Sequence, residues 1–205
     1  MRKYPKPLTD LITVFNALPG IGIKTAERLA FAVLDWDESK INTFSEVISS
    51  VNTDLDFCEL CGNIAEKNSL CVFCSDPLRN KELICVVENS AQAAAVESGG
   101  VFNGLYHILG GKLAPVQGKN IEDLNFATLE NRVKNSEVKE VIIALGHDVE
   151  SRATSMYITS LLESYDVRIT IPARGLPAGS DIAYADPATL AAAFAGRRIV
   201  EEDRA

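Results

Sequence analysis

The chain has 205 residues, of which 47% are hydrophobic and 23% are charged, and its formal net charge at pH 7 is −8. This composition is that of a folded globular protein and not of a disordered chain. The length is sufficient for one large domain or two to three small ones. No run of about 18 apolar residues is present, which argues against a membrane span. The N-terminal segment also lacks the apolar core of a secretion signal. We therefore expect a cytoplasmic protein.

Charge is distributed unevenly along the chain. Residues 1–34 carry five basic residues against two acidic ones, a local net charge of +3, which leaves −11 for the remaining 171 residues. The negative total argues against a nucleic-acid-binding protein, but its distribution predicts that any contact with phosphate occurs near the N-terminus. The acidic remainder suits protein partners or a metal cation. The basic residues of the N-terminal segment are Arg2, Lys3, Lys6, Lys24 and Arg28.

The first predicted elements are two helices joined by a glycine-rich turn. Apolar residues follow a helical spacing over residues 8–18, and a second stripe runs from residue 23 to about residue 34. Between them, Pro19-Gly20-Ile21-Gly22 must end the first helix, because proline and glycine both disfavour a helix interior. Helix, Gly-x-Gly turn and helix resemble the helix-hairpin-helix motif of proteins that bind DNA without sequence specificity. The alternative is an αα-hairpin with an ordinary glycine turn.

Five residues of this hairpin are candidates for contact with DNA: Gly20, Gly22, Ile23, Lys24 and Arg28. Glycines lack a Cβ atom, so they let backbone N–H groups come close to a phosphate. The start of the second helix adds unpaired N–H donors and a partial positive charge. Lys24 and Arg28 are four residues apart, so they project from the same side and can bracket a phosphate track. Such contacts predict weak sequence preference and steep salt dependence.

A third helical pattern covers residues 37–55, with Asp37 or Ser39 as its N-cap. Its apolar residues are Ile41, Phe44, Val47, Ile48, Val51 and Leu55. The segment carries no evident chemistry, and we interpret it as a packing helix that leads to the cysteines.

Four cysteines form two Cys-x-x-Cys pairs separated by nine residues: Cys58, Cys61, Cys71 and Cys74. Two such pairs can wrap one tetrahedral Zn²⁺ ion, with sulfurs about 2.3 Å from the metal. The linking segment is mostly polar and cannot supply a core, and four cysteine ligands leave no coordination position open for catalysis. We therefore predict a structural zinc, about one per chain. The alternatives are two disulfides, which are less typical of a chain without secretion signals, and a redox Cys-x-x-Cys, which normally stands alone.

The rest of the chain alternates between apolar strands and helices. Strands are expected at residues 83–87, 105–109, 140–145 and 167–171, and helices at residues 91–98, 121–135 and 150–164. This alternation indicates an α/β fold with a mainly parallel sheet. Cys85 lies inside the first strand and is expected to be buried. A last helix over residues 187–196 begins with Asp186 as N-cap and Pro187 in its first position, and residues 199–200 are expected to add an edge strand to this subunit or a neighbour.

Three acidic residues follow the expected strands: Glu88 after the first, and Asp148 and Glu150 after the third. Functional groups gather beyond the carboxyl ends of parallel strands, and a strand-terminal Glu with an Asp-x-acid turn resembles the Toprim domain. In catalytic Toprim proteins the Glu is an acid/base and an Asp-x-Asp pair holds Mg²⁺, which prefers oxygen ligands. We favour an acidic patch for protein contact over non-catalytic binding of a divalent cation, and both over Mg²⁺-dependent strand chemistry. His107 and His147 are interpreted as surface or packing residues.

The order of these motifs points to one family. Its signatures resemble residues 18–30, 71–77, 84–88 and 195–198 of this chain. The whole chain resembles the bacterial recombination mediator RecR family. The resemblance implies a helix-hairpin-helix DNA-binding domain (residues 1–55), a four-cysteine zinc finger (56–78), a Toprim domain (80–176) and a C-terminal helix and tail (177–205).

By that resemblance, the chain is expected to be a non-catalytic mediator of DNA repair and homologous recombination. It would act with RecO, and in some settings RecF, to help load RecA on gapped DNA coated with SSB. Family members form ring-like oligomers, typically homotetramers, whose hairpin domains face a hole wide enough for duplex DNA, and Lys24 and Arg28 fall on the DNA-facing positions. Four copies of the basic segment would concentrate positive charge there. The alternatives are a Mg²⁺-dependent Toprim enzyme that acts on DNA strands and a protein-only scaffold that touches DNA through its partners.

One loop departs from the family pattern. After the third Toprim strand the family usually carries Asn-Pro-Thr-x-Glu-Gly-Glu, whereas this chain reads Gly146-His-Asp-Val-Glu-Ser-Arg152. Glu150 is kept, Asp148 is new, and Arg152 stands in place of the later acid. The loop is expected to mark a divergent branch of the family.

Overall fold

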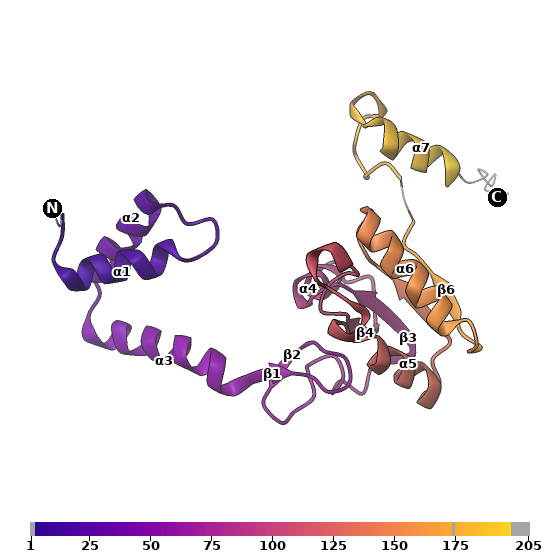
Figure 1. The fold of residues 1–205 in the computed structure, drawn as a ribbon, viewed down its shortest axis with the longest axis horizontal. Helices are drawn as coiled ribbons and strands as arrows, with labels where there is room; N and C mark the ends of the chain where they lie inside the picture. The colour runs from indigo at the N-terminus through magenta and orange to yellow at the C-terminus, as the bar shows by residue number, and fades with distance from the viewer. Residues whose placement is uncertain (1–2, 174, 198–205) are drawn as a thin grey trace, which may run out of the picture. The chain divides into compact units, whose positions relative to one another are not determined.

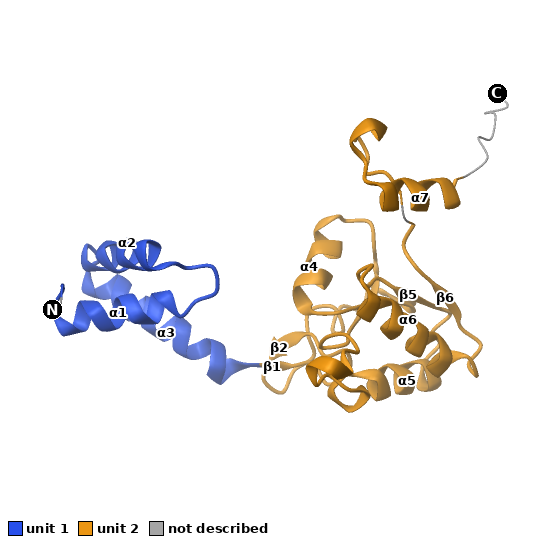
Figure 2. Ribbon diagram, turned by 45° about the horizontal axis from the view of Figure 1, so that its top comes forward, with its two compact units in different colours: residues 1–55 blue, residues 56–205 orange. Residues whose placement is uncertain are grey.

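The computed structural model describes residues 3–173 and 175–197, and its elements fall into two units that divide between Leu55 and Asp56 (Figure 2). Unit 1 consists of three helices, α1 (Lys6–Asn16), α2 (Ile23–Leu34) and α3 (Glu38–Asp54) (Figure 1). α1 begins two residues earlier than predicted. Its first turn contains a proline, which is tolerated there because the N–H groups of a first turn have no partner within the helix. The edge strand predicted at residues 199–200 lies outside the described residues.

α1 and α2 pack on each other through small side chains. Ala26 and Ala30 of α2 are fully buried against Ile12 of α1. Their short side chains lie four residues apart on one face, so the two helices can approach closely. Half-buried apolar side chains surround this contact: Tyr4, Leu8, Leu11, Phe15 and Ile21. Apolar packing therefore holds one side of the hairpin and leaves Lys24 and Arg28 exposed.

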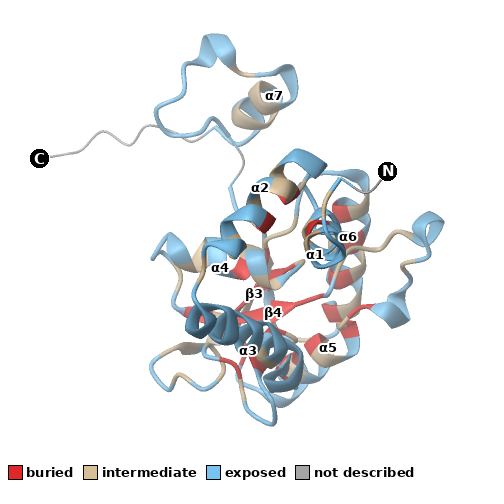
Figure 3. Ribbon diagram, turned by 90° about the vertical axis from the view of Figure 1, so that its left-hand side faces the viewer, coloured by how far each residue is buried: buried red, intermediate tan, exposed pale blue. Residues whose placement is uncertain are grey.

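α3 begins at Asp37, whose carboxylate accepts a hydrogen bond from the Lys40 N–H at 2.8 Å. Asp37, and not Ser39, is therefore the N-cap. None of the 17 residues of α3 is buried, and Figure 3 shows this helix largely in the colour of exposed residues. A row of apolar side chains stays exposed: Ile41, Phe44, Val47, Ile48 and Val51. The sequence predicts a packing helix. Among the described residues of unit 1, Trp36 packs edge-on against Phe44, with ring centroids 5.2 Å apart, but the row as a whole stays exposed.

Unit 2 is built around a four-stranded sheet in the order β4-β3-β5-β6. Its strands are β3 (Asn80–Val87), β4 (Gly104–Ile108), β5 (Glu140–Ile143) and β6 (Arg168–Thr170). Every neighbouring pair is parallel. Helix α4 (Ser90–Ser98) packs on one face, and α5 (Phe126–Asn135) and α6 (Val149–Leu162) pack on the other. The α/β fold with a parallel sheet is confirmed.

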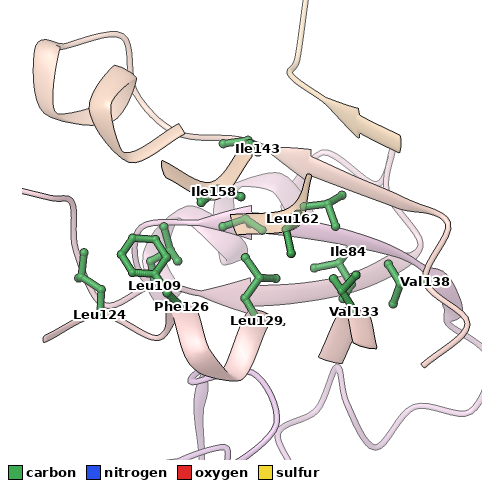
Figure 4. Close-up of a cluster of buried hydrophobic side chains, with 12 residues drawn as sticks. Ile84, Leu109, Leu124, Phe126, Leu129, Val133, Val138, Ile143, Ile158 and Leu162 are labelled. Atoms are coloured by element: carbon green, nitrogen blue, oxygen red, sulfur yellow. The ribbon is translucent and has the colours of Figure 1, made fainter. Parts of the chain in front are cut away.

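Alternate residues of β3 contribute to two separate apolar layers. Ile84 and Val86 face α5 and α6, in the cluster that Figure 4 shows. Cys85 and Val87 face α4. A strand buried on both faces explains the continuous apolar run of this segment. Cys85 is buried, as predicted, and burial raises the pKa of its thiol to about 11, so it stays protonated and inert.

The prediction of one helix over residues 121–135 is wrong in its first turn. The structure has a short 3-10 helix at Ile121–Asp123, then a break, then α5. The break comes from Asn125, whose N–H donates to the Leu109 carbonyl at 3.0 Å and whose side-chain amide donates to the Ile108 carbonyl at 2.9 Å. These bonds tie the chain to the end of β4 and interrupt the helix.

A small sheet at the start of unit 2 and a last helix are two further elements. A two-stranded sheet of β1 (Leu55–Phe57) and β2 (Ile64–Glu66) frames the first cysteine pair, and its short strands carry no sequence pattern that predicts them. The last helix, α7 (Pro187–Ala195), begins as predicted, with Asp186 accepting hydrogen bonds from two N–H groups of the first turn. Within residues 3–173 and 175–197, no helix has the length and apolar character needed to cross a membrane.

Candidate DNA interface and metal centre

The turn between α1 and α2 presents backbone N–H groups on an open surface. Gly20 has a φ of +78°, a conformation that favours glycine. Gly22 is the extended N-cap of α2 and supplies no side-chain cap. At either glycine, nothing in the described chain beyond the neighbouring residues lies within 4 Å of where a Cβ atom would stand. A phosphate can therefore reach the first N–H groups of α2, which also carry the positive end of the helix dipole.

Three side chains predicted to contact DNA lie on the surface of the first turns of α2. Ile23 is 57% exposed, and Lys24 and Arg28 are exposed too. Within the described residues, neither cation forms an ion pair, whereas Glu27 binds the Lys3 ammonium at 3.0 Å. The carboxylate of α2 is therefore already neutralised, and the two cations keep their charge for a phosphate.

The four predicted metal ligands come together at one point. Cys58, Cys61 and Cys71 are buried, Cys74 is half-buried, and their sulfurs all lie within 4.8 Å of one another. Around a Zn²⁺ ion with bonds of about 2.3 Å, tetrahedral sulfurs stand about 3.8 Å apart. The spacing fits a single tetrahedral ion. All the cysteines are free of disulfide bonds, so the structure does not contain the disulfide alternative.

Both cysteine pairs adopt the same local turn. The Gly62 N–H donates to the Cys58 carbonyl at 2.8 Å, and the Ser75 N–H donates to the Cys71 carbonyl at 3.0 Å. In the first pair, the Asn63 N–H also donates a hydrogen bond to the Cys61 sulfur at 3.4 Å. Donation to sulfur stabilises the thiolate, which is the form that binds a metal.

The close approach of the sulfurs concentrates negative charge. The Cys61 and Cys71 sulfurs are 3.4 Å apart. Their hydrogen bond lowers the pKa of Cys71 and raises the pKa of Cys61, so the pair holds one proton tightly. A divalent cation bound here would displace that proton and neutralise the thiolates.

The first cysteine pair is anchored to the edge of the parallel sheet. The Cys61 carbonyl accepts a hydrogen bond from the Ile108 N–H of β4 at 2.7 Å. A Cβ atom at Gly62 would stand 2.5 Å from the Asn125 side chain and 2.9 Å from the Ile108 carbonyl oxygen, and Gly62 has a φ of +72°. Glycine at this position therefore lets the backbone of the pair lie directly against β4.

The second cysteine pair is anchored by an aromatic and ionic cluster that no motif reveals. Phe73 packs on Tyr106 with ring centroids 4.8 Å apart, and the Arg79 guanidinium lies 4.7 Å from the Phe73 ring centroid. Arg79 also pairs with Glu97 of α4. Glu97 accepts a hydrogen bond from the Tyr106 hydroxyl at 2.9 Å. The metal centre is thus fastened to both β4 and α4.

The structure brings Glu88 and Asp148 close to one ammonium group at the carboxyl edge of the sheet. Lys112 Nζ lies 2.8 Å from Asp148 Oδ2 and 3.8 Å from Glu88 Oε2. The other Asp148 oxygen accepts the Ser151 N–H and caps α6. The Lys112 ammonium holds the pKa of Asp148 well below its usual range. Glu150 is half-buried in the first turn of α6 and forms no ion pair within the described residues.

Lys112 is missed by sequence reasoning, because it lies in a loop 36 residues before Asp148 and belongs to no motif. The histidines match their interpretation. His107 is buried, with Nε2 2.9 Å from the Asn125 carbonyl and Nδ1 3.3 Å from Arg132, and burial lowers its pKa to about 3. His147 is exposed. Neither joins a group of potential metal ligands among the described residues.

A cavity of about 620 Å³ opens beside Glu88 at the ends of β3 and β4. Three carboxylates line it, those of Glu59, Glu88 and Asp123, with Phe57 and Ile108 among its apolar residues. No lysine or arginine is among the described residues that line it. The cavity therefore suits a cationic group.

Comparisons with known proteins agree with this arrangement. Three family models match the chain: "RecR, helix-hairpin-helix" over residues 8–51, "Toprim domain" over residues 82–173, and "RecR, C-terminal" over residues 175–198. The chain is 43% identical to the recombination protein RecR of Staphylococcus haemolyticus strain JCSC1435. The aligned 194 residues cover 95% of this chain and 98% of that protein. RecR proteins of Staphylococcus aureus strains MRSA252 and Newman are 42% identical with the same coverage.

Proposed function

This chain belongs to the RecR family of recombination proteins, and we propose that it binds DNA directly as a non-catalytic mediator of DNA repair and homologous recombination. The observation that carries the proposal is the open hairpin turn, where Lys24 and Arg28 stand exposed beside uncapped N–H groups. In the cell, and specifically in the cytoplasm, the protein acts with RecO, and in some settings RecF, to help load RecA on SSB-coated gapped DNA.

The hairpin geometry supports contact with the DNA backbone. Backbone N–H groups and cations bind phosphates in any sequence, and each phosphate neutralised on duplex DNA adds about 0.9 to the slope of log affinity against log salt. Loss of both Lys24 and Arg28 should therefore reduce that slope by about 1.8 for each hairpin engaged.

Fluorescence anisotropy with gapped DNA over a salt series tests the hairpin. The Lys24→Ala/Arg28→Ala variant should bind more weakly and show the reduced slope. The control is Lys40→Ala/Lys67→Ala, which removes two exposed cations outside the hairpin turn, and it should follow the wild type. Unchanged binding of the hairpin variant at low salt would overturn the proposal and favour the scaffold alternative.

The metal of the four-cysteine centre is proposed to be zinc. Four thiolates at tetrahedral spacing favour this ion, and four protein ligands leave it no open position. When bound, the ion links the two cysteine pairs and supplies no catalysis. Its role is to stiffen the segment that the Cys61 carbonyl and Phe73 fasten to the sheet.

The absence of catalysis is proposed from the acidic edge. Asp148 is engaged by a lysine and by a helix N-terminus, so it is not a free metal ligand. Incubation of the protein with labelled DNA and Mg²⁺, for the wild type and Glu88→Gln, separates the two classes of function. Cleavage or strand passage that depends on Glu88 would overturn the non-catalytic mediator function and favour a Mg²⁺-dependent Toprim enzyme.

Assembly into a homotetrameric ring is proposed together with DNA binding. The exposed apolar row of α3 supports it, because five large apolar side chains on one helix favour contact with a second copy of this chain. The acidic edge and its cavity support a second contact, with a cationic surface of RecO. Light scattering with and without gapped DNA measures the assembly, and a monomer under both conditions would contradict the ring.

A further inference from the structure

Lys112 lies where a metal ion would be expected in a cluster of acids at a sheet edge. Its ammonium is 2.8 Å from one Asp148 oxygen and 3.8 Å from one Glu88 oxygen. The side chains of Lys112 and Glu88 are each 25% exposed and that of Asp148 is 45% exposed, so the group is partly shielded from solvent. Lys112 comes from the loop after β4, and the two acids follow β3 and β5.

We propose that the Lys112 ammonium is a built-in counter-ion that takes the place of a divalent cation between Glu88 and Asp148. Mg²⁺ needs oxygens at about 2.0–2.1 Å in octahedral geometry and keeps several of its waters. The ammonium, 2.8 Å from the Asp148 oxygen and 3.8 Å from the Glu88 oxygen, lies in the space between them, and its charge repels a second cation. The edge thus keeps its acids oriented without a metal.

The two carboxylates are held by their own elements, independently of the lysine. The Glu88 N–H donates to the Gln92 side-chain oxygen at 2.9 Å, and the Gln92 amide lies 3.4 Å from the Glu88 carboxylate. Asp148 is held by the Ser151 N–H at 2.8 Å. The hydrogen bond with Asp148 and the charges of Glu88 and Glu150 raise the pKa of Lys112, which keeps it protonated. Removal of the lysine should therefore leave two oriented carboxylates that a hard cation can bind.

This role rests on the contacts of Lys112 alone and stands whether or not the hairpin binds DNA. If Lys112 has this role, the acidic edge, which includes the nearby Glu150, keeps a net negative charge that does not change with the concentration of Mg²⁺. A partner that binds this edge would meet the same charge at any Mg²⁺ concentration.

Manganese binding followed by electron paramagnetic resonance of free Mn²⁺ tests the proposal. Lys112→Met keeps the apolar stem and removes the charge, and it should bind one Mn²⁺ about tenfold or more tightly than the wild type does at this edge. Lys139→Met is the matched control, because Lys139 pairs with Glu82 and its loss changes the net charge equally. The control should behave as the wild type, and Lys112→Met/Glu88→Gln should lose the gained site.

Equal Mn²⁺ affinity in the wild type and Lys112→Met would overturn the proposal, as would a gain of the same size in the Lys139→Met control. Circular dichroism checks that the variants are folded. If Lys112→Met does not fold, Lys112→Gln serves in its place, with the same expected gain and the same refuting outcome. Neither result depends on DNA binding, so failure here is distinct from failure of the mediator function.

Discussion

A substitution at Gly62 would test whether the first cysteine pair of the metal centre is held against the parallel sheet. A Gly62→Ala substitution meets two obstacles. Its φ of +72° is unfavourable for alanine by about 1–2 kcal/mol. Its Cβ atom would also lie 2.9 Å from the Ile108 carbonyl oxygen and 2.5 Å from the Asn125 amide, and Asn125 moves only by giving up its hydrogen bond to that same carbonyl. Overpacking of this kind costs about 1–3 kcal/mol, which gives a total loss of about 2–5 kcal/mol.

Gly118→Ala is the matched control for this experiment. Gly118 has a φ of +75°, but nothing beyond its neighbouring residues lies within 4 Å of its Cβ position. It should lose only the backbone cost of about 1–2 kcal/mol. Urea unfolding followed by circular dichroism, with metal release measured in parallel, gives both values. Equal losses in the two variants would refute the close contact between the first cysteine pair and β4.

Three further predictions concern pH, assembly and metal. Burial lowers the pKa of His107 to about 3, so the unfolded state binds the proton first, and the free energy of unfolding should fall by about 1.6 kcal/mol between pH 6.5 and pH 5. A His107→Gln variant with the same pH dependence in urea titrations would contradict this. Val47→Glu on the exposed row of α3 should lower the mass measured by light scattering, whereas Ser45→Glu on the same helix should not, and two equal masses would argue against this face. Metal analysis should find about one Zn²⁺ per chain. Cys58→Ser or Cys74→Ser should reduce the yield of folded protein, because the free energy of binding a structural zinc is also folding free energy. A metal-free variant with native-like stability would contradict a structural role for the zinc.

Local patterns predicted most of the fold, and the reason is that each depends on a few neighbouring residues. Apolar spacing placed α2 and the strands of the sheet, and Asp186 with Pro187 placed the start of α7. The family resemblance, the parallel α/β fold and the helix-hairpin-helix are confirmed by the matched family models and the relatives. The four-cysteine cluster also follows from local spacing, because two close pairs need only one short linker to meet.

Prediction was wrong or incomplete where distant residues decide the outcome. The first turn of the predicted helix at residues 121–135 is lost because Asn125 bonds to Ile108 and Leu109, which precede it by more than a dozen residues. α3 reads as a packing helix, yet its apolar row stays exposed, because amphipathic spacing shows that a face is apolar and not what covers it.

The sequence by itself determined most of the elements, the four-cysteine cluster and the hairpin with its exposed cations, since these depend on the spacing of near neighbours. Only the tertiary structure decided how the elements meet. It placed Gly62 against β4, stacked Arg79 on Phe73, and brought Lys112 to Asp148 across 36 residues of chain. The physical reason is that the folded chain brings together side chains that are far apart in sequence, as the parallel sheet does when it brings the ends of its strands to one edge, and no local pattern records that meeting.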